Sequence, residues 1–242
     1  MAIELSNLTF TDQADVVPFS GVEEILNTGV ANTLAGDDII TGIGLYGISI
    51  LPFATLISGG GNDTITGIST GNIVTSGTGI VNNGLIETGD GDDVITGTTA
   101  QGYGIVNGGI ISTGNGNDLI IGIGDISRND IYNYGIINTG NGDDSIIASG
   151  SFRSGFDNQG SVFLGNGKDY FKGFGSGNFN GGNGKDTLEL TSGSYTVGIS
   201  GTTVNFTKGD SIMITSEFEK LIAGNTIYNF ASLTAGQTIV VA

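Results

Sequence analysis

Short apolar segments separated by glycine recur along the whole chain, and their pattern predicts β-strands. After Asp93, residues 94–96, 103–106 and 110–113 form three such segments within one repeat. The 45 glycines and two prolines among 242 residues place a turn roughly every 8–12 residues, and segments able to form a helix are nearly absent. The pattern therefore predicts an all-β fold.

The apolar residues of these segments predict a core built as columns. Ile95, Ile105 and either Ile110 or Ile111 have counterparts at matching offsets in the neighbouring repeats. Residues that recur at one offset occupy equivalent positions in successive coils of a repeat fold. We therefore expect them to point inward and to stack on their counterparts above and below.

Between the apolar segments lies a polar motif, Gly-x-Gly-x-Asp, which occurs six times and has a degenerate copy that ends at Asp38. The final aspartates are separated by 25, 30, 25, 26, 25 and 17 residues. A period of this kind predicts a solenoid in which each interval forms one coil. The seven carboxylates that then form one file are those of Asp38, Asp63, Asp93, Asp118, Asp144, Asp169 and Asp186.

A file of carboxylates needs cations. At the ~4.8 Å spacing of adjacent strands, neighbouring charges repel by ~3 kcal/mol at an effective dielectric constant near 20. Glycine tolerates positive φ, so the backbone of the motif can curl and turn its carbonyl groups inward. Carboxylate and carbonyl oxygens without nitrogen or sulfur are the ligands that Ca²⁺ prefers. The motif predicts several calcium ions bound along one edge.

The segments GGGNDTITG, TGDGDDVITG, TGNGNDLIIG, TGNGDDSIIA and GGNGKDTLEL resemble the calcium-binding nonapeptide of RTX proteins, the haemolysin-type repeat. The resemblance covers residues 33–190. It implies a right-handed parallel β-solenoid (a β-roll or β-helix) with Ca²⁺ between successive turns. Beside the seven aspartates, it implies ligand carbonyls at Gly59, Gly61, Gly89, Gly91, Gly114, Gly116, Gly140, Gly142, Gly165, Gly167, Gly182 and Gly184.

Three features depart from the family pattern. Only one motif occurs per coil of about 25 residues, where the family usually packs two into a shorter coil, so we expect ions along one edge only. Lys168 and Lys185 stand where the family favours Asn or Asp, which weakens the two C-terminal sites. Leu34 replaces the leading glycine of the first turn.

Two further files of polar residues are expected. Asn82, Asn107, Asn133 and Asn158 recur every 25 or 26 residues, and an inward-facing asparagine can bond both its own turn and the coil above. We interpret them as a structural asparagine ladder. A second file contains Thr88, Thr113 and Thr139, broken by Leu164; a flat threonine file is an ordinary strand face or, alternatively, an ice-binding surface.

The charge of the chain limits its partners. Seven basic and 24 acidic residues give a net charge of −17, which excludes nucleic acid as an electrostatic partner and argues against anionic membranes. The ion-free chain repels itself, and its narrow coils bury few side chains. We therefore expect calcium binding to supply folding free energy.

The sequence points to an extracellular or cell-surface location. The chain contains no cysteine, no N-terminal basic and apolar leader, and no uninterrupted apolar segment long enough for a membrane span. The resemblance to RTX proteins implies type I secretion with an uncleaved C-terminal signal, for which residues 231–242 are suitable. Calcium-free export would then be followed by folding outside the cell, where calcium is abundant.

We expect one cooperative domain in three parts. Residues 1–32 are expected to form an N-terminal cap, 33–186 the calcium-binding solenoid, and 187–242 a set of C-terminal capping strands. Caps are required because an open terminal coil leaves unpaired strand edges and an exposed core.

The favoured function is a structural or adhesive calcium-binding solenoid without enzymatic activity. The alternative is a polysaccharide-active module, a lyase or epimerase, which uses Arg128, Arg153 and the phenols of Tyr103, Tyr132 and Tyr134. Without histidine, and without a compact acid and base cluster, we assign no catalytic residue. Extracellular polysaccharide or a cell surface is the expected partner beside calcium.

Overall fold

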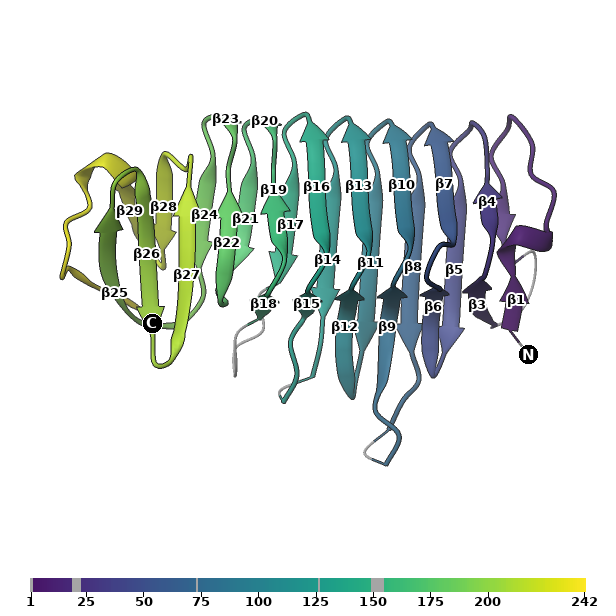
Figure 1. Ribbon diagram of the computed structural model, residues 1–242, viewed down its shortest axis with the longest axis horizontal. Coiled ribbons are helices and arrows are strands. Elements are labelled where there is room, and N and C mark those ends of the chain that lie inside the picture. Colours follow the sequence, from purple (N-terminus) through teal and green to yellow (C-terminus); the bar gives the residue numbers. More distant parts are fainter. Residues whose placement is uncertain (1, 19–22, 73, 126, 149–154) are drawn as a thin grey trace.

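The computed structural model describes residues 2–18, 23–72, 74–125, 127–148 and 155–242. The chain is all-β, with strands stacked in three sheets along its length (Figure 1). Its two helical elements in the described ranges are single 3-10 turns, η1 (Leu5–Asn7) and η2 (Phe230–Ser232). Neither is long or apolar enough to cross a membrane.

The sheets are named A, B and C. Sheet A contains β1 (Ala2–Glu4), β3 (Glu24–Asn27), β6 (Tyr46–Ile50), β9 (Gly77–Asn82), β12 (Gly102–Asn107), β15 (Ile131–Asn133) and β18 (Phe156–Asn158). Sheet B contains β2 (Val16–Val17), β5 (Ile39–Gly44), β8 (Thr64–Ser69), β11 (Val94–Thr99), β14 (Leu119–Ile123), β17 (Ser145–Ala148), β21 (Tyr170–Gly173), β24 (Thr187–Leu190), β28 (Lys220–Ala223) and β29 (Thr226–Asn229). Sheet C contains β4 (Val30–Asn32), β7 (Thr55–Gly60), β10 (Leu85–Asp90), β13 (Ile110–Asn115), β16 (Ile136–Asn141), β19 (Ser161–Phe163), β20 (Asn166–Gly167), β22 (Gly177–Asn180), β23 (Asn183–Gly184), β25 (Gly193–Ser200), β26 (Thr203–Lys208), β27 (Ser211–Ser216) and β30 (Thr238–Val241).

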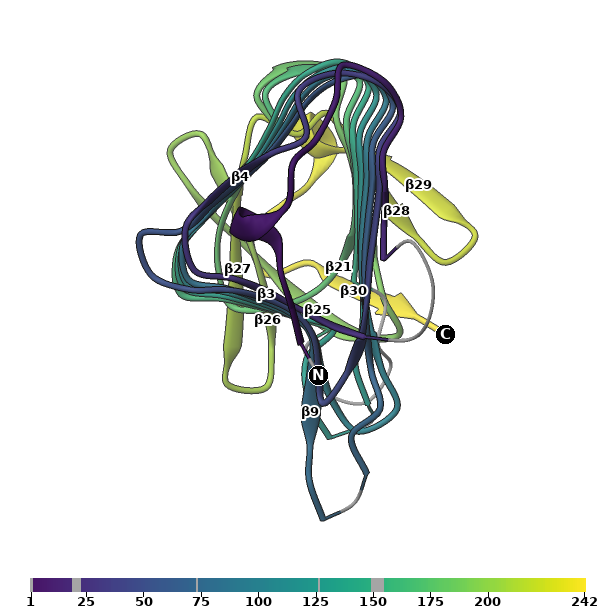
Figure 2. The same cartoon turned by 90° about the vertical axis from the view of Figure 1, so that its right-hand side faces the viewer.

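From β2 to β19 the chain visits the sheets in the repeating order B, A, C, and each strand stacks in parallel on the equivalent strand of a neighbouring coil. In sheet B, for example, Ile95 pairs with Ile65 on one side and Ile120 on the other. The end-on view shows successive coils superimposed in a three-sided cross-section (Figure 2). The repeat and the segment pattern thus correctly predicted stacked parallel strands.

Each sheet contributes one column of apolar side chains to the core. Ile95 of sheet B, Ile105 of sheet A and Ile111 of sheet C have no exposed surface, whereas Ile110 points outward and is 42% exposed. The expected inward direction is confirmed, with Ile111 rather than Ile110 in the core. Toward the C-terminal end the core residues of all three columns become aromatic. Phe156 of sheet A, Phe171 of sheet B and Phe179 of sheet C contact one another there, with ring centroids 4.8–5.4 Å apart.

Sheets A and B converge until their backbones touch. An added Cβ on Gly97 would lie 2.3 Å from the carbonyl oxygen of Gly104, and one on Gly67 would lie 2.2 Å from that of Gly79. No real Cβ tolerates such contacts, so only glycine permits the two strands to meet there. The glycine file in sheet B therefore sets the narrow corner of the cross-section.

Parallel stacking extends beyond residues 33–186 at both ends. Within 1–32, β2, β3 and β4 already form one coil, which β1 and the buried Leu5 of η1 cover. Within 187–242, β24, β27 and β28 still pair in parallel, while β25, β26, β29 and β30 are antiparallel. The antiparallel strands run against the direction of the coils, so no further parallel coil is added beyond them.

Candidate metal site

The Gly-x-Gly-x-Asp motifs form one stack of turns between sheets C and B, at the top of Figure 1. Both glycines of each complete motif have positive φ, for example +108° at Gly89 and +136° at Gly91. A Cβ on Gly89 would lie 1.8 Å from the carbonyl oxygen of Gly59 in the preceding coil. Glycine is therefore required twice over, by its backbone angle and by the close approach of adjacent turns.

The seven predicted aspartates lie in one file, and each is at most 1% exposed. Each carboxylate uses Oδ1 to accept a hydrogen bond from the backbone N–H of the aspartate in the preceding coil. The bonds from Asp63 to Asp93 and from Asp93 to Asp118 measure 2.8 and 2.9 Å. The same bond joins Asp38 to Asp63, Asp118 to Asp144, Asp144 to Asp169 and Asp169 to Asp186.

The second carboxylate oxygen, Oδ2, is buried without a hydrogen-bond partner in all seven aspartates. An ionised carboxylate in that state is costly unless a proton or a cation neutralises it. Threonine hydroxyls lie beside the file, but those of Thr88 and Thr113 donate to main-chain carbonyls of the following coil, at 3.0 and 2.9 Å. The threonine hydroxyls therefore do not neutralise the Oδ2 atoms, which stay buried without a hydrogen-bond donor.

Burial raises the pKa of every aspartate in the file, and neighbouring acidic residues raise it further. The pKa reaches about 6 at Asp93 and Asp144 and about 7 at Asp169, and in each case the backbone N–H bonded to Oδ1 opposes the rise. The file therefore binds protons well above the usual pKa range of aspartate.

Two further ladders run along the exposed side of the same turns. At the fourth motif position the backbone N–H of Asp92 donates to Asn62 Oδ1, and that of Asn117 donates to Asp92 Oδ1. This ladder ends at Lys168, whose N–H donates to Asp143 Oδ1 and whose Nζ lies 3.6 Å from Asp143 Oδ2. At the second position, side-chain amides link Asp90, Asn115, Asn141, Asn166 and Asn183.

The structure extends the file by one residue at each end. The backbone N–H of Asp15 donates to Asp38 Oδ1, and Glu219 Oε2 accepts from the N–H of Asp186 at 2.7 Å. Glu219 is not among the residues that the motif predicts. It precedes β28 as each aspartate precedes its strand, so aligning 219–223 with the repeats would have revealed it.

The residues of the file fit a hard cation in chemical type. Their free donors are carboxylate oxygens, and the glycine carbonyls of the turn lie against the α-carbons of the next coil. Oxygen-only donors are suited to Ca²⁺. Within the described ranges, however, no three acidic side chains converge on one point, so each ion would rely on main-chain oxygens or water for its remaining ligands.

The asparagine ladder is confirmed. Asn82, Asn107, Asn133 and Asn158 are buried, and the Nδ2 of each of the first three donates to Oδ1 of the next at 2.7–2.8 Å. The threonine file is also inside: Thr88, Thr113 and Thr139 have no exposed surface. It offers no face to ice, because its hydroxyls bond the next coil.

The structure places Arg128 beside the predicted tyrosines. Its guanidinium lies 5.2 Å from the centre of the Tyr103 ring and donates to the Tyr103 hydroxyl at 3.0 Å. Tyr132 lies between Tyr103 and Tyr134, with ring centroids 5.8 and 5.5 Å away. Arg153 lies outside the described residues.

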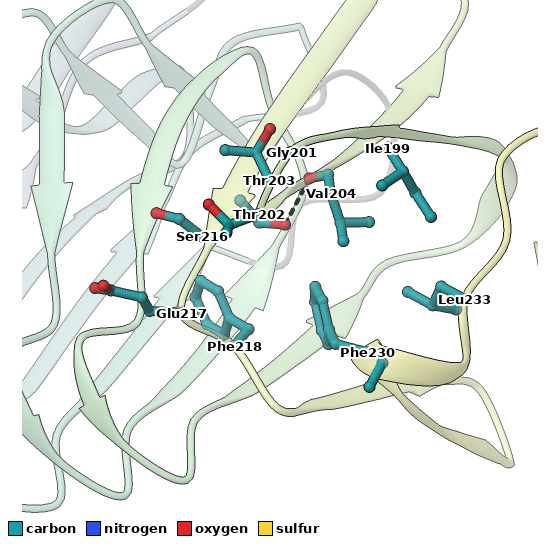
Figure 3. Close-up of a pocket in the computed structure, with 12 residues that line it drawn as sticks. Ile199, Gly201, Thr202, Thr203, Val204, Ser216, Glu217, Phe218, Phe230 and Leu233 are labelled. Carbon is teal, nitrogen blue, oxygen red and sulfur yellow. Dashed lines mark hydrogen bonds between the residues drawn. The ribbon is translucent and has the colours of Figure 1, made fainter.

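A cavity among the C-terminal strands lies near the end of the aspartate file, where burial raises the pKa of Asp186 and the lining residue Glu217 is close enough to raise it further (Figure 3). Its volume is about 460 Å³, and the rings of Phe218 and Phe230 form much of its floor. Among its lining residues only Glu217 carries a titratable side chain. The cavity therefore holds no acid and base pair.

Comparison with protein-family models, curated proteins and solved structures finds no match for this chain.

Proposed function

We propose that this protein is a calcium-binding β-solenoid with a structural or adhesive role. The observation that carries the proposal is the file of seven buried aspartates, each with one carboxylate oxygen bonded to the backbone and the other unpartnered. In this proposal Ca²⁺ neutralises the file through those free oxygens and through carbonyl oxygens of the flanking glycines.

The proposed solenoid is right-handed, of the RTX type, with coils of about 25 residues and ions along one edge. The repeated glycine at two fixed motif positions supports this assignment beside the aspartates. Lys168 and Lys185 place cationic side chains where acidic residues would strengthen binding, so we expect the weakest sites near Asp169 and Asp186.

The proposed biological setting is the outside of the cell. A chain of charge −17 that needs cations to neutralise buried carboxylates would stay unfolded at the low calcium concentration of the cytoplasm. It would fold after export, and calcium would act as the switch. The folded solenoid would then hold an extended surface toward a polysaccharide or another cell.

Isothermal titration of Ca²⁺ into protein stripped with EDTA tests the site assignment. We expect several sites, and a lower stoichiometry in the variant Asp93→Asn/Asp118→Asn. The matched control is Asp92→Asn, which removes a carboxylate from the exposed ladder and should leave the stoichiometry unchanged. An equal loss in both variants would place the ions outside the buried file.

A polysaccharide-active module remains the second candidate, because Arg128 lies on Tyr103 beside Tyr132 and Tyr134. In such a module the Arg128 guanidinium would bind the carboxylate of a sugar acid, and a tyrosine hydroxyl would transfer the proton. The test is incubation with alginate or pectin and measurement of the ultraviolet absorbance of unsaturated products. A rise that Tyr103→Phe and Arg128→Ala abolish would favour this function over a purely structural one.

A further inference from the structure

The outer face of sheet B is free of charge across five consecutive strands. In β5, β8, β11, β14 and β17 every outward side chain is aliphatic or carries a single hydroxyl. We call this surface the B face; its residues are Ile39, Thr41, Ile43, Thr64, Thr66, Ile68, Val94, Thr96, Thr98, Leu119, Ile121, Ile123, Ser145 and Ile147. The first charged outward residue on this side is Lys172 in β21, which pairs with Glu189 at 2.8 Å.

The absence of charge is specific to this face in the described structure. The outer face of sheet C carries Glu87, and that of sheet A carries Glu24 and Asp157, with Arg128 beside it. The acidic residues are concentrated instead at the Gly-x-Gly-x-Asp turns. A chain of net charge −17 therefore presents one side on which a similar chain can approach without opposing rows of carboxylates.

The sequence of β14 is typical of a strand that is covered on both sides. Residues 119–121 read Leu-Ile-Ile, and Ile120 alone points into the core, while Leu119 and Ile121 face outward. Parallel strands with near-continuous apolar sequence are normally buried on both faces. The core of the solenoid covers only the inner face of sheet B.

We propose that the B face packs against the B face of a second copy of this chain, forming a symmetric dimer. The same strand spacing recurs in both copies, so the side-chain rows of one can fit between the rows of the other, as in packed β-sheets. In a dimer with a two-fold axis, both copies use the same surface patch, so one self-complementary face is sufficient.

The size of the B face sets the strength of the contact. Five strands at ~4.8 Å and three outward positions at ~6.7 Å cover ~24 Å by ~20 Å, or ~480 Å² on each copy. Stable interfaces bury about 800 Å² per partner. We therefore expect a weak dimer whose population rises with protein concentration.

Sedimentation velocity over a concentration series from about 5 µM to about 500 µM, in calcium, tests the dimer. The unmodified chain should shift from monomer toward dimer across this range. Ile121→Lys, at the middle of β14 on the B face, should remain monomeric, whereas Ile110→Lys, outward on sheet C, should dimerise as before. A chain that stays monomeric throughout, or equal loss in both variants, would overturn the proposal.

Cross-linking provides a second test that needs no disruptive substitution. The chain has no cysteine, so single-cysteine variants report one position each. Thr96→Cys on the B face should form a disulfide-linked dimer under mild oxidation, and Ser112→Cys, outward on sheet C, should not. Linkage through Ser112→Cys alone would assign the interface to sheet C and contradict the proposal.

Discussion

At the scale of the residue, the decisive atom is Oδ2 of each buried aspartate. Oδ1 accepts a backbone hydrogen bond that an asparagine could accept equally well, so the ladder alone does not require a carboxylate. The unpartnered Oδ2 is what distinguishes aspartate from asparagine in this file. Aspartate at these positions is therefore better explained by a cation than by turn structure.

Asp118→Asn separates the two roles. The new amide keeps the Oδ1 acceptor and places Nδ2 beside the Thr113 hydroxyl, so in EDTA at neutral pH we expect the free energy of unfolding to rise by about 1–2 kcal/mol. In saturating calcium the variant should instead lose part of the stabilisation that the ion gives the unmodified chain. Because the unmodified chain is expected to be unfolded in EDTA, the folded fraction from circular dichroism measures the first change, and urea unfolding in saturating calcium measures the second.

The exposed Asp92→Asn is the control for this comparison and should change stability by less than about 0.5 kcal/mol. If Asp118→Asn destabilises the chain in EDTA, then the carboxylate serves the turn itself. That result would contradict the proposed role of Oδ2.

The sequence predicted the position of every aspartate in the file, because the motif and its interval place them in register. It did not predict the direction of their hydrogen bonds or the unpartnered oxygen, which depend on how adjacent turns approach. It also did not show that burial between adjacent turns raises the pKa of Asp169 to about 7. Such contacts join residues of different coils.

At the scale of the element, the shape of the solenoid's cross-section depends on where the backbones of sheets A and B come into contact. The apolar pattern predicted three strands in each coil, and the structure has them as far as β19, with β11 and β13 extending beyond the predicted segments. The shorter coil that begins at Asp169 has no strand in sheet A, which ends at β18. The convergence of sheets A and B was not predicted. The residues that permit this convergence are Gly42, Gly67, Gly97 and Gly122. In a sequence with 45 glycines, nothing distinguishes these four from the glycines of turns.

Gly97→Ala tests the convergence. The added methyl group would lie 2.3 Å from the Gly104 carbonyl oxygen, a backbone atom that cannot move away without separating the sheets. We expect a loss of about 3 kcal/mol in the free energy of unfolding. Gly198→Ala in β25, where the nearest atom is 3.6 Å away, should cost less than about 1 kcal/mol. Similar melting temperatures for the two variants would contradict this account of the corner.

At the scale of the whole molecule, folding and charge are coupled through the aspartate file. With calcium removed, a proton is the remaining means of neutralising a buried carboxylate. The pKa of Asp93 and Asp144 rises from 3.8 to about 6, and that of Asp169 to about 7, chiefly through burial. Between pH 4 and pH 7 the folded chain therefore binds more protons than the unfolded chain.

The sign of the pH dependence follows from this difference. Stability in EDTA should be greatest below the unfolded pKa near 3.8 and should fall as pH rises through about 6 to 7. The folded fraction from circular dichroism in EDTA at pH 5, 6, 7 and 8 measures the fall, and saturating calcium should abolish it. The triple variant Asp93→Asn/Asp144→Asn/Asp169→Asn should show a smaller dependence, and an unchanged slope would assign it to other groups.

The central claim is that calcium completes the aspartate file and thereby folds the chain. Its most direct test is far-ultraviolet circular dichroism of EDTA-stripped protein at neutral pH during titration with Ca²⁺, with Mg²⁺ as the control ion. We predict a cooperative gain of β signal with calcium and little change with magnesium. A chain that is fully folded in EDTA and indifferent to calcium would contradict the account and leave the aspartates as structural ladder residues.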